Sequence, residues 1–148
     1  ALNHISSVEE TDIILPLHPR TSKIIEQNLD KALYSKLIAN PHLKIVKPVS
    51  FLDMIALEKN CSMVITDSGG VQKEAYYFKK PCVILRSETE WVEIVNQKAA
   101  RIANADKELI IESYHRLSED KNIKYPEIFG DGKASEFICQ TMLDNQLS

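Results

Sequence analysis

The chain has 148 residues, of which 44% are hydrophobic and 26% charged, and its formal net charge is −3. This length fits one domain, and the hydrophobic fraction can form a buried core, which excludes a disordered or fibrous protein. Acids and bases are interspersed along the chain. Because a protein that binds phosphate backbones presents a basic face, we expect no nucleic-acid partner.

Hydropathy and cysteine content set the expected compartment. No apolar stretch approaches the roughly 20 residues that cross a bilayer, so we expect no membrane partner. The three cysteines, Cys61, Cys82 and Cys139, are odd in number and lack metal-ligand spacing. We interpret all three as reduced residues in or near the core. With no signal peptide evident, this indicates a cytoplasmic protein, and we expect no metal and no cofactor.

Apolar periodicity alternates between two kinds of segment along the chain. Helical spacing is already present at residues 1–8. Short apolar runs predict strands at residues 12–17, 43–46, 62–66, 81–85 and 99–102. Apolar residues three and four positions apart predict helices at residues 29–39, 51–59, 71–78, 107–117 and after Gly132. Apolar strands that alternate with helices indicate α/β architecture, with a parallel sheet covered on both faces in a Rossmann-like doubly wound fold.

In such sheets ligands bind at the carboxyl ends of strands, which directs attention to the loop after the strand predicted at residues 62–66. This loop begins the segment Thr66-Asp67-Ser68-Gly69-Gly70-Val71-Gln72-Lys73-Glu74. The two glycines let the backbone approach a ligand, and Ser68 can cap the helix while free N–H groups face a diphosphate. The alternative is a tight turn with an ordinary N-cap. Glu74 can accept hydrogen bonds from ribose hydroxyls, but by spacing alone it more simply complements the helix dipole.

Two more loops follow predicted strands at the same edge. His18 and Arg20 come directly after the first strand, where they can hold a phosphate or sugar, with Pro19 stiffening the loop. The alternative for this segment is an ordinary surface loop. Arg86 follows the fourth strand with three carboxylates, among them Glu90. That segment is either part of a site or an acid-rich helix N-terminus.

Together these motifs resemble the non-hydrolysing UDP-N-acetylglucosamine 2-epimerases in order and spacing. The segments that carry the resemblance are His18-Pro19-Arg20-Thr21, Pro48-Val49-Ser50-Phe51-Leu52, the segment from Thr66 to Glu74, Lys80-Pro81-Cys82, Arg86, Thr89-Glu90 and Gly130-Asp131-Gly132-Lys133-Ala134-Ser135. The resemblance implies a glycosyltransferase-B-like architecture, two Rossmann-like domains with a nucleotide sugar between them. Residues 1–148 would then be the C-terminal, UDP-binding domain, incomplete at its N-terminus.

The resemblance also assigns roles to individual residues. The UDP-binding residues that it implies are Ser68, Gly69, Gly70, Glu74, Met54 and Phe51, and the cleft residues are His18, Arg20, Arg86 and Glu90. The serine and glycines match the diphosphate loop, and Glu74 matches the ribose ligand. Met54 stands where the family has a large apolar residue against the uracil, and Phe51 lies in the loop that meets the base edge.

Two departures from the family limit what this chain can do. Trp91 stands where the family commonly has an arginine that reaches the phosphates. The resemblance implies that the family's His-Arg-x-Glu-Asn segment, on a central strand, would precede Ala1, and that the domain with the acid/base residues would lie outside residues 1–148. We therefore expect no catalytic residue here and no activity from this chain alone. An unfilled central strand position would leave unpaired backbone groups, which predicts a homo-oligomer.

The reaction implied by the resemblance interconverts UDP-N-acetylglucosamine and UDP-N-acetylmannosamine. UDP is eliminated and then re-added on the other face, and a helix N-terminus stabilises the departing diphosphate. The expected ligand is thus UDP or a UDP-sugar. Two alternatives stay open. One is a UDP-sugar glycosyltransferase domain of the same architecture, which the complete Gln72-x-Glu74 signature disfavours; the other is a non-catalytic binding module or remnant.

Overall fold

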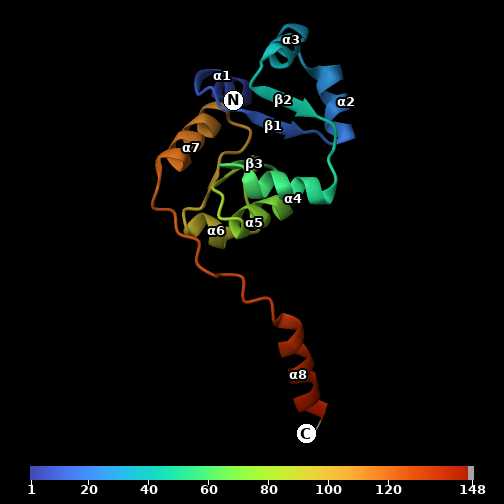
Figure 1. Ribbon diagram of the computed structural model, residues 1–148, viewed down its shortest axis with the longest axis vertical. Coiled ribbons are helices and arrows are strands. Elements are labelled where there is room, and N and C mark those ends of the chain that lie inside the picture. Colours follow the sequence, from blue (N-terminus) through green and yellow to red (C-terminus); the bar gives the residue numbers. More distant parts are fainter. Residues whose placement is uncertain (147–148) are drawn as a thin grey trace.

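The computed structural model describes residues 1–146 and has an α/β architecture (Figure 1). Its elements are α1 (Leu2–Val8), β1 (Ile13–Pro16), α2 (Pro19–Asn28), α3 (Lys31–Ala39), β2 (Leu43–Val46), α4 (Phe51–Asn60), β3 (Val64–Thr66), α5 (Gly69–Tyr77), β4 (Cys82–Ile84), α6 (Val92–Asn96), β5 (Ala100–Ile102), α7 (Lys107–Glu119) and α8 (Ala134–Gln146). Every predicted strand is present within two residues of its predicted bounds, so the reading of short apolar runs as strands is confirmed.

The strands form two parallel sheets. β1 pairs with β2, and Ile13 lies opposite Leu43. The other sheet has the order β3-β4-β5, with Cys82 of β4 between Val64 and Ala100. The predicted parallel sheet is therefore present as two separate sheets, because in residues 1–146 no strand pairs with the open edge of β1 or of β3. In each sheet the strand order runs outward from this break, as in a doubly wound fold.

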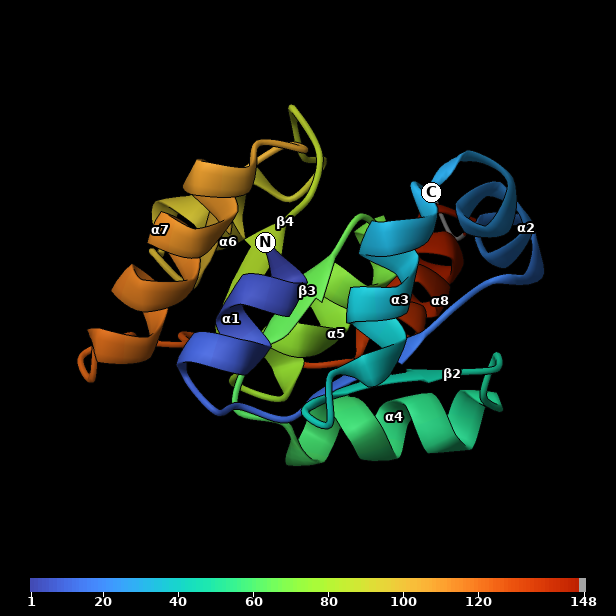
Figure 2. The same ribbon diagram turned by 90° about the horizontal axis from the view of Figure 1, so that it is seen from above.

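The central strand β4 is buried on both faces. Cys82 and Ile84 point into one core cluster with residues of α5 and α6, whereas Val83 points into another with residues of α1 and α7. All three are at most 1% exposed. Because successive side chains of a strand alternate between faces, a strand covered on both sides must be wholly apolar. Figure 2 shows α1 and α7 together in one part of the molecule.

Two helices lie outside the predicted ranges, the short α6 and α2. α2 begins where the sequence suggested a loop, because His18 is its N-cap and its Nδ1 accepts a hydrogen bond from the Arg20 N–H at 3.3 Å. Pro19 occupies the first turn, where its missing N–H costs nothing. The helix predicted at residues 29–39 is real but begins later. The Asp30 carboxylate caps it by accepting two backbone N–H groups at 2.9 and 3.1 Å.

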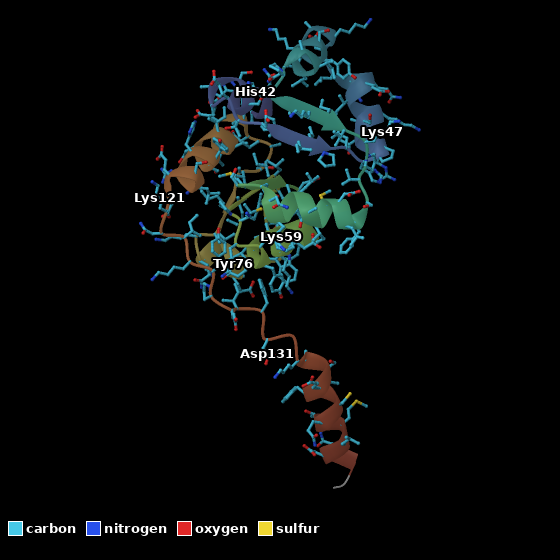
Figure 3. All side chains as sticks on the ribbon, in the orientation of Figure 1. His42, Lys47, Lys59, Tyr76, Lys121 and Asp131 are labelled. Atoms are coloured by element: carbon cyan, nitrogen blue, oxygen red, sulfur yellow. The ribbon has the colours of Figure 1, made fainter. Side chains whose placement is uncertain are left out.

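A linker joins the body of the molecule to α8, which extends away from it (Figure 1). Buried Tyr76 anchors this linker, since its hydroxyl donates a hydrogen bond to the Pro126 carbonyl at 2.8 Å. The rings of Tyr125 and Phe129 lie 5.4 and 5.7 Å from that of Tyr76. Figure 3 shows Tyr76 within the body, while Asp131 lies beyond it on the way to α8.

The three cysteines have free thiols in different surroundings. Cys82 is buried in β4, and Cys61 after α4 is half-buried. Cys139 is exposed, and its interpretation as a near-core residue is wrong because residues 134–145 of α8 are all exposed. Within the described residues, the helices are too short or too polar to traverse a lipid bilayer.

Candidate functional site

The glycine loop, residues 66–70, joins β3 to α5 at the carboxyl end of β3. α5 begins at Gly69 with Ser68 in the N-cap position. The predicted capping by the Ser68 side chain is wrong, because this side chain makes no capping bond. Its backbone N–H instead donates to the Thr66 hydroxyl at 3.0 Å, which holds the loop. The first N–H groups of α5 therefore lack a side-chain cap, and a helix N-terminus in that state favours an anion.

Neither glycine of this loop has a positive φ, so neither is required by a special backbone conformation. A Cβ on Gly70 would find only the Ser68 Oγ within 4 Å, at 3.9 Å, so that face is open. A Cβ on Gly69 would lie 3.2 Å from a carboxylate oxygen of Glu90. An approaching ligand therefore meets open backbone at Gly70.

Arg86 and Glu90 lie at this helix N-terminus, as their position after β4 predicted. Arg86 Nη1 donates to both carboxylate oxygens of Glu90 at 2.8 Å. The pKa of Glu90 is held below its ordinary value by its own backbone N–H and then by Arg86. The ion pair lies beside Gly69 and has almost no net charge, because the guanidinium of Arg86 is neutralised by the Glu90 carboxylate.

A buried hydrogen bond ties α5 to the loop that carries this pair. Gln72 is fully buried, and its Oε1 accepts a hydrogen bond from the Thr89 hydroxyl at 2.6 Å. The backbone N–H of Trp91 donates to the same hydroxyl at 3.0 Å. The sequence places Gln72 in the Gln72-x-Glu74 signature but assigns it no role. The structure shows that it fixes the neighbouring loop.

Trp91 packs against the start of α5 and does not point into solvent. Its indole N–H donates to the Gly69 carbonyl at 2.7 Å, and its ring lies 5.5 Å from that of Phe129. The ammonium of Lys73 lies 4.4 Å from the centre of the Trp91 ring. A cation thus stands beside the position where the sequence comparison predicted a lost positive charge.

Two carboxyl groups lie side by side between α4 and α5. Glu74 is half-buried on α5, whereas Glu58 on α4 is only 4% exposed. Burial and then the neighbouring Glu74 raise the pKa of Glu58 to about 7. No group among the described residues hydrogen-bonds either carboxylate oxygen of Glu58. The sequence analysis missed Glu58, because an acid near the end of an amphipathic helix usually faces solvent.

The other predicted site residues lie on neighbouring elements. Phe51 opens α4 after β2 and is 72% exposed, and Met54 is half-buried one turn later. The Ser50 hydroxyl accepts the Asp53 N–H at 3.2 Å, so α4 has the serine cap that α5 lacks. The exposed side chains of His18 and Arg20 follow β1, at the start of α2.

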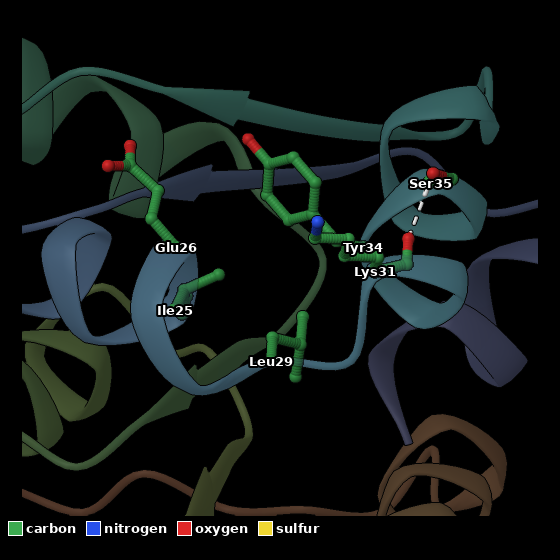
Figure 4. Close-up of a pocket in the computed structure, with 6 residues that line it drawn as sticks. All are labelled: Ile25, Glu26, Leu29, Lys31, Tyr34 and Ser35. Carbon is green, nitrogen blue, oxygen red and sulfur yellow. Dashed lines mark hydrogen bonds between the residues drawn. The ribbon is translucent and has the colours of Figure 1, made fainter.

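Two hollows of the molecule lie away from the glycine loop. One of about 270 Å³ lies between α2 and α3 (Figure 4) and is lined by Ile25, Glu26, Leu29, Lys31, Tyr34 and Ser35. Another of about 590 Å³ lies between the end of α5 and the linker, against Tyr76 and Phe129. Within the described residues no three His, Cys, Asp or Glu side chains are grouped to hold a metal ion. Neither hollow contains a predicted site residue.

These features define a parallel α/β domain with an uncapped glycine loop at the carboxyl end of a strand. The sequence model for UDP-N-acetylglucosamine 2-epimerase matches residues 1–143, and the chain belongs to this family. A UDP-N-acetylglucosamine 2-epimerase homolog of Methanococcus maripaludis is 42% identical over 88% of this chain and 35% of its own length. The UDP-2,3-diacetamido-2,3-dideoxy-D-glucuronate 2-epimerase of Pseudomonas aeruginosa is 42% identical over 95% of this chain and 37% of its own.

A solved structure has the same fold. The UDP-GlcNAc 2-epimerase of Methanocaldococcus jannaschii, in complex with UDP-GlcNAc and UDP, superposes with a TM-score of 0.81 at 37% identity. The superposition covers 96% of this chain and 38% of that protein. The Rossmann-like fold predicted from the sequence is thus confirmed, and the chain spans little more than a third of the relatives it matches.

The buried Glu58 predicts how stability depends on pH. Its pKa is raised from 4.5 to about 7, so the native carboxyl keeps a proton that the unfolded chain loses between these values. Stability from this group is full below pH 4.5 and is lost as pH rises to about 7. Glu58→Gln cannot ionise and should be more stable than wild type at pH 8, by on the order of 1–3 kcal/mol.

Urea unfolding at pH 5 and pH 8 measures this difference. The exposed Glu127→Gln is the matched control, since it removes the same charge from the surface. If the free energy of unfolding changed equally with pH in both variants, the prediction that the Glu58 pKa is raised by burial would be wrong.

Proposed function

We propose that this chain is the UDP-binding part of a UDP-N-acetylglucosamine 2-epimerase. The intact enzyme would eliminate UDP from UDP-N-acetylglucosamine and re-add it on the other face, giving UDP-N-acetylmannosamine. The observation that carries the proposal is the uncapped N-terminus of α5 with open space at Gly70. The two relatives at 42% identity have names that differ in the sugar and share UDP, which supports UDP as the part of the substrate bound here.

On this proposal the diphosphate binds at the glycine loop, the ribose hydroxyls bind Glu74, and the uracil lies near Met54 and Phe51. Helix N–H groups without an internal acceptor would hold the departing diphosphate without reorganising, which lowers the barrier to elimination. The cation of Lys73 over Trp91 adds positive charge near the start of the helix. The carbon 2 bases would belong to the part of the relatives that this chain does not cover.

A non-catalytic UDP-binding module is the second candidate. The observation that favours it is Trp91, whose indole N–H is already used by the Gly69 carbonyl. Such a module would bind UDP at the same loop, so binding alone does not separate it from the epimerase. We further propose a cytoplasmic location, which the free thiols of the three cysteines support.

The glycine loop predicts the effect of two substitutions on UDP binding. Gly70→Ala places a methyl group where the chain itself leaves space, so the fold should persist while the phosphates lose their approach and binding disappears. Glu74→Gln keeps the shape but removes charge from the ribose hydrogen bonds, which should cost about 1–2 kcal/mol. Titration of UDP followed by NMR measures both effects.

Gly69→Val should also abolish binding, but it crowds Glu90 and disturbs the Arg86 pair. Gly70→Ala is therefore the sharper variant. Chemical-shift changes clustered away from residues 68–74, or unchanged affinity in Gly70→Ala, would mean that the site lies elsewhere.

This chain should have no epimerase activity by itself, because the proposed carbon 2 bases are not in it. Incubation of the purified chain with UDP-N-acetylglucosamine, followed by separation of the two epimers, measures this directly. An intact relative serves as the positive control. Turnover above background from clean protein would contradict the proposal that the carbon 2 bases lie in the part of the relatives that this chain does not cover.

We propose that the chain forms a homo-oligomer through the break between its sheets. The Ile13 N–H donates to the His42 carbonyl at 2.7 Å and the Leu17 N–H to the Val46 carbonyl at 3.1 Å, so the Ile14 N–H faces the open side of β1. β3 has an open side too, opposite β4. Unpaired strand edges with apolar side chains are templates for pairing with another chain, and Ile14 is 47% exposed.

Light scattering over a range of concentrations should therefore detect association. Ile14→Lys places a charge on this edge and should weaken association roughly tenfold, equivalent to ~1.4 kcal/mol. Ile24→Lys on α2 is the matched control, since Ile24 is 52% exposed and lies outside the sheets. A monomeric wild type at high concentration would contradict the proposal.

A further inference from the structure

Glu58 has no role in the binding site proposed above, yet it is the one acidic side chain in the described residues that is buried. A buried ionised carboxylate is costly unless it is paired with a cation or hydrogen-bonded. Glu58 has neither form of compensation, because in the part of the chain that the structure describes no hydrogen-bond donor reaches its two oxygens and no cation acts on it. The physical state that fits this environment is a neutral carboxylic acid.

The groups around Glu58 agree with this state. Glu74 on α5 is the charged group that faces it across the contact between α4 and α5. The thiols of Cys61, next to α4, and Cys82, on β4, are its other titratable neighbours. Lys80 acts on Cys61, where it opposes the effect of burial on the thiol pKa. Two adjacent carboxyl groups without a cation between them are costly to ionise together, so one of them keeps its proton to a higher pH.

We propose that Glu58 is a positioning residue for the nucleotide: its neutral carboxyl group donates a hydrogen bond to the Glu74 carboxylate and turns that carboxylate toward the ribose. This proposal rests on the proposed function, in which Glu74 accepts the ribose hydroxyls. The O–H of Glu58 uses one lone pair of one Glu74 carboxylate oxygen. The remaining lone pairs of the carboxylate are left for the two ribose hydroxyls.

The arrangement makes nucleotide affinity depend on pH. With one shared proton the pair carries a single negative charge, and half-buried Glu74 is held in place. Loss of that proton near pH 7 gives two carboxylates that repel each other and adds negative charge close to the diphosphate. The protonated pair therefore binds the nucleotide more tightly. Affinity is highest below pH 7 and falls as pH rises through it.

The test is the dissociation constant of UDP-N-acetylglucosamine, measured by NMR titration from pH 6 to pH 9. This probe is chosen because its phosphates are esterified and do not titrate there, whereas a terminal phosphate has a second pKa near 6. Wild type should lose about five- to tenfold in affinity over this range. Glu58→Gln should match wild type at pH 6 and escape this loss, because its amide N–H donates to Glu74 at every pH.

Glu58→Leu removes the donor without adding a charge. It should bind about fivefold more weakly than wild type at pH 6 and show no Glu58-dependent change with pH. Urea unfolding of each variant confirms that the comparison is made on folded protein. Wild-type affinity in Glu58→Leu, or the same pH profile in wild type and Glu58→Gln, would overturn the inference.

The outcomes separate this inference from the proposed function. If shifts map to residues 68–74 and Glu74→Gln weakens binding, but Glu58 variants leave the pH profile unchanged, only the inference is wrong. If the probe binds elsewhere or not at all, the proposed function fails as well. The shared proton is tested without ligand by a carbon-13 carboxyl titration, in which Glu58 should titrate near pH 7. Titration of Glu58 near its ordinary value of 4.5 would overturn the inference.

Discussion

The candidate site depends on one buried hydrogen bond, from the Thr89 hydroxyl to Gln72. Gln72 is on the inner side of α5, and Thr89 is in the loop after β4, so this bond joins two crossovers of the sheet. A hydrogen bond between fully or partly buried groups is costly to break, because the separated groups would lack water. The bond holds Arg86 and Glu90 over Gly69 and lets Trp91 close against the first turn. Without this bond, the loop after β4 would no longer be held against the glycine loop.

Trp91 shows how a departure from the family pattern is accommodated. An arginine would bring a charge directly to the start of α5, whereas the indole donates a single hydrogen bond to the Gly69 carbonyl. The flat ring in turn supports the Lys73 ammonium at 4.4 Å. The positive charge is therefore displaced by about one helical turn.

Much of the fold could be predicted from local patterns. Strands such as the one at Cys82 were recognised because burial on both faces makes every residue apolar. The break beside β1 could not be predicted from periodicity, since periodicity reports burial but not which strands pair. α2 was missed because His18 and Pro19, which start it, also suit a loop. Glu58 was missed for a related reason: its burial depends on α5 packing over α4, a tertiary contact that no spacing rule reveals.

The break between the sheets also separates two parts that differ in their stability against local unfolding: the part with β1 and β2, and the part with β3, β4 and β5. β3, β4 and β5 contribute Val64, Cys82, Ile84 and Ala100 to one large core cluster, whereas α2 and α3 bury no residue at all. Regions with few buried apolar contacts open locally at lower free energy than the global unfolding transition. We therefore expect the part with β1 and β2 to open at lower free energy, so that its amide protons exchange with solvent while the part with β3, β4 and β5 stays closed. The glycine loop belongs to the more stable part, so we expect the candidate site to keep its shape through these fluctuations.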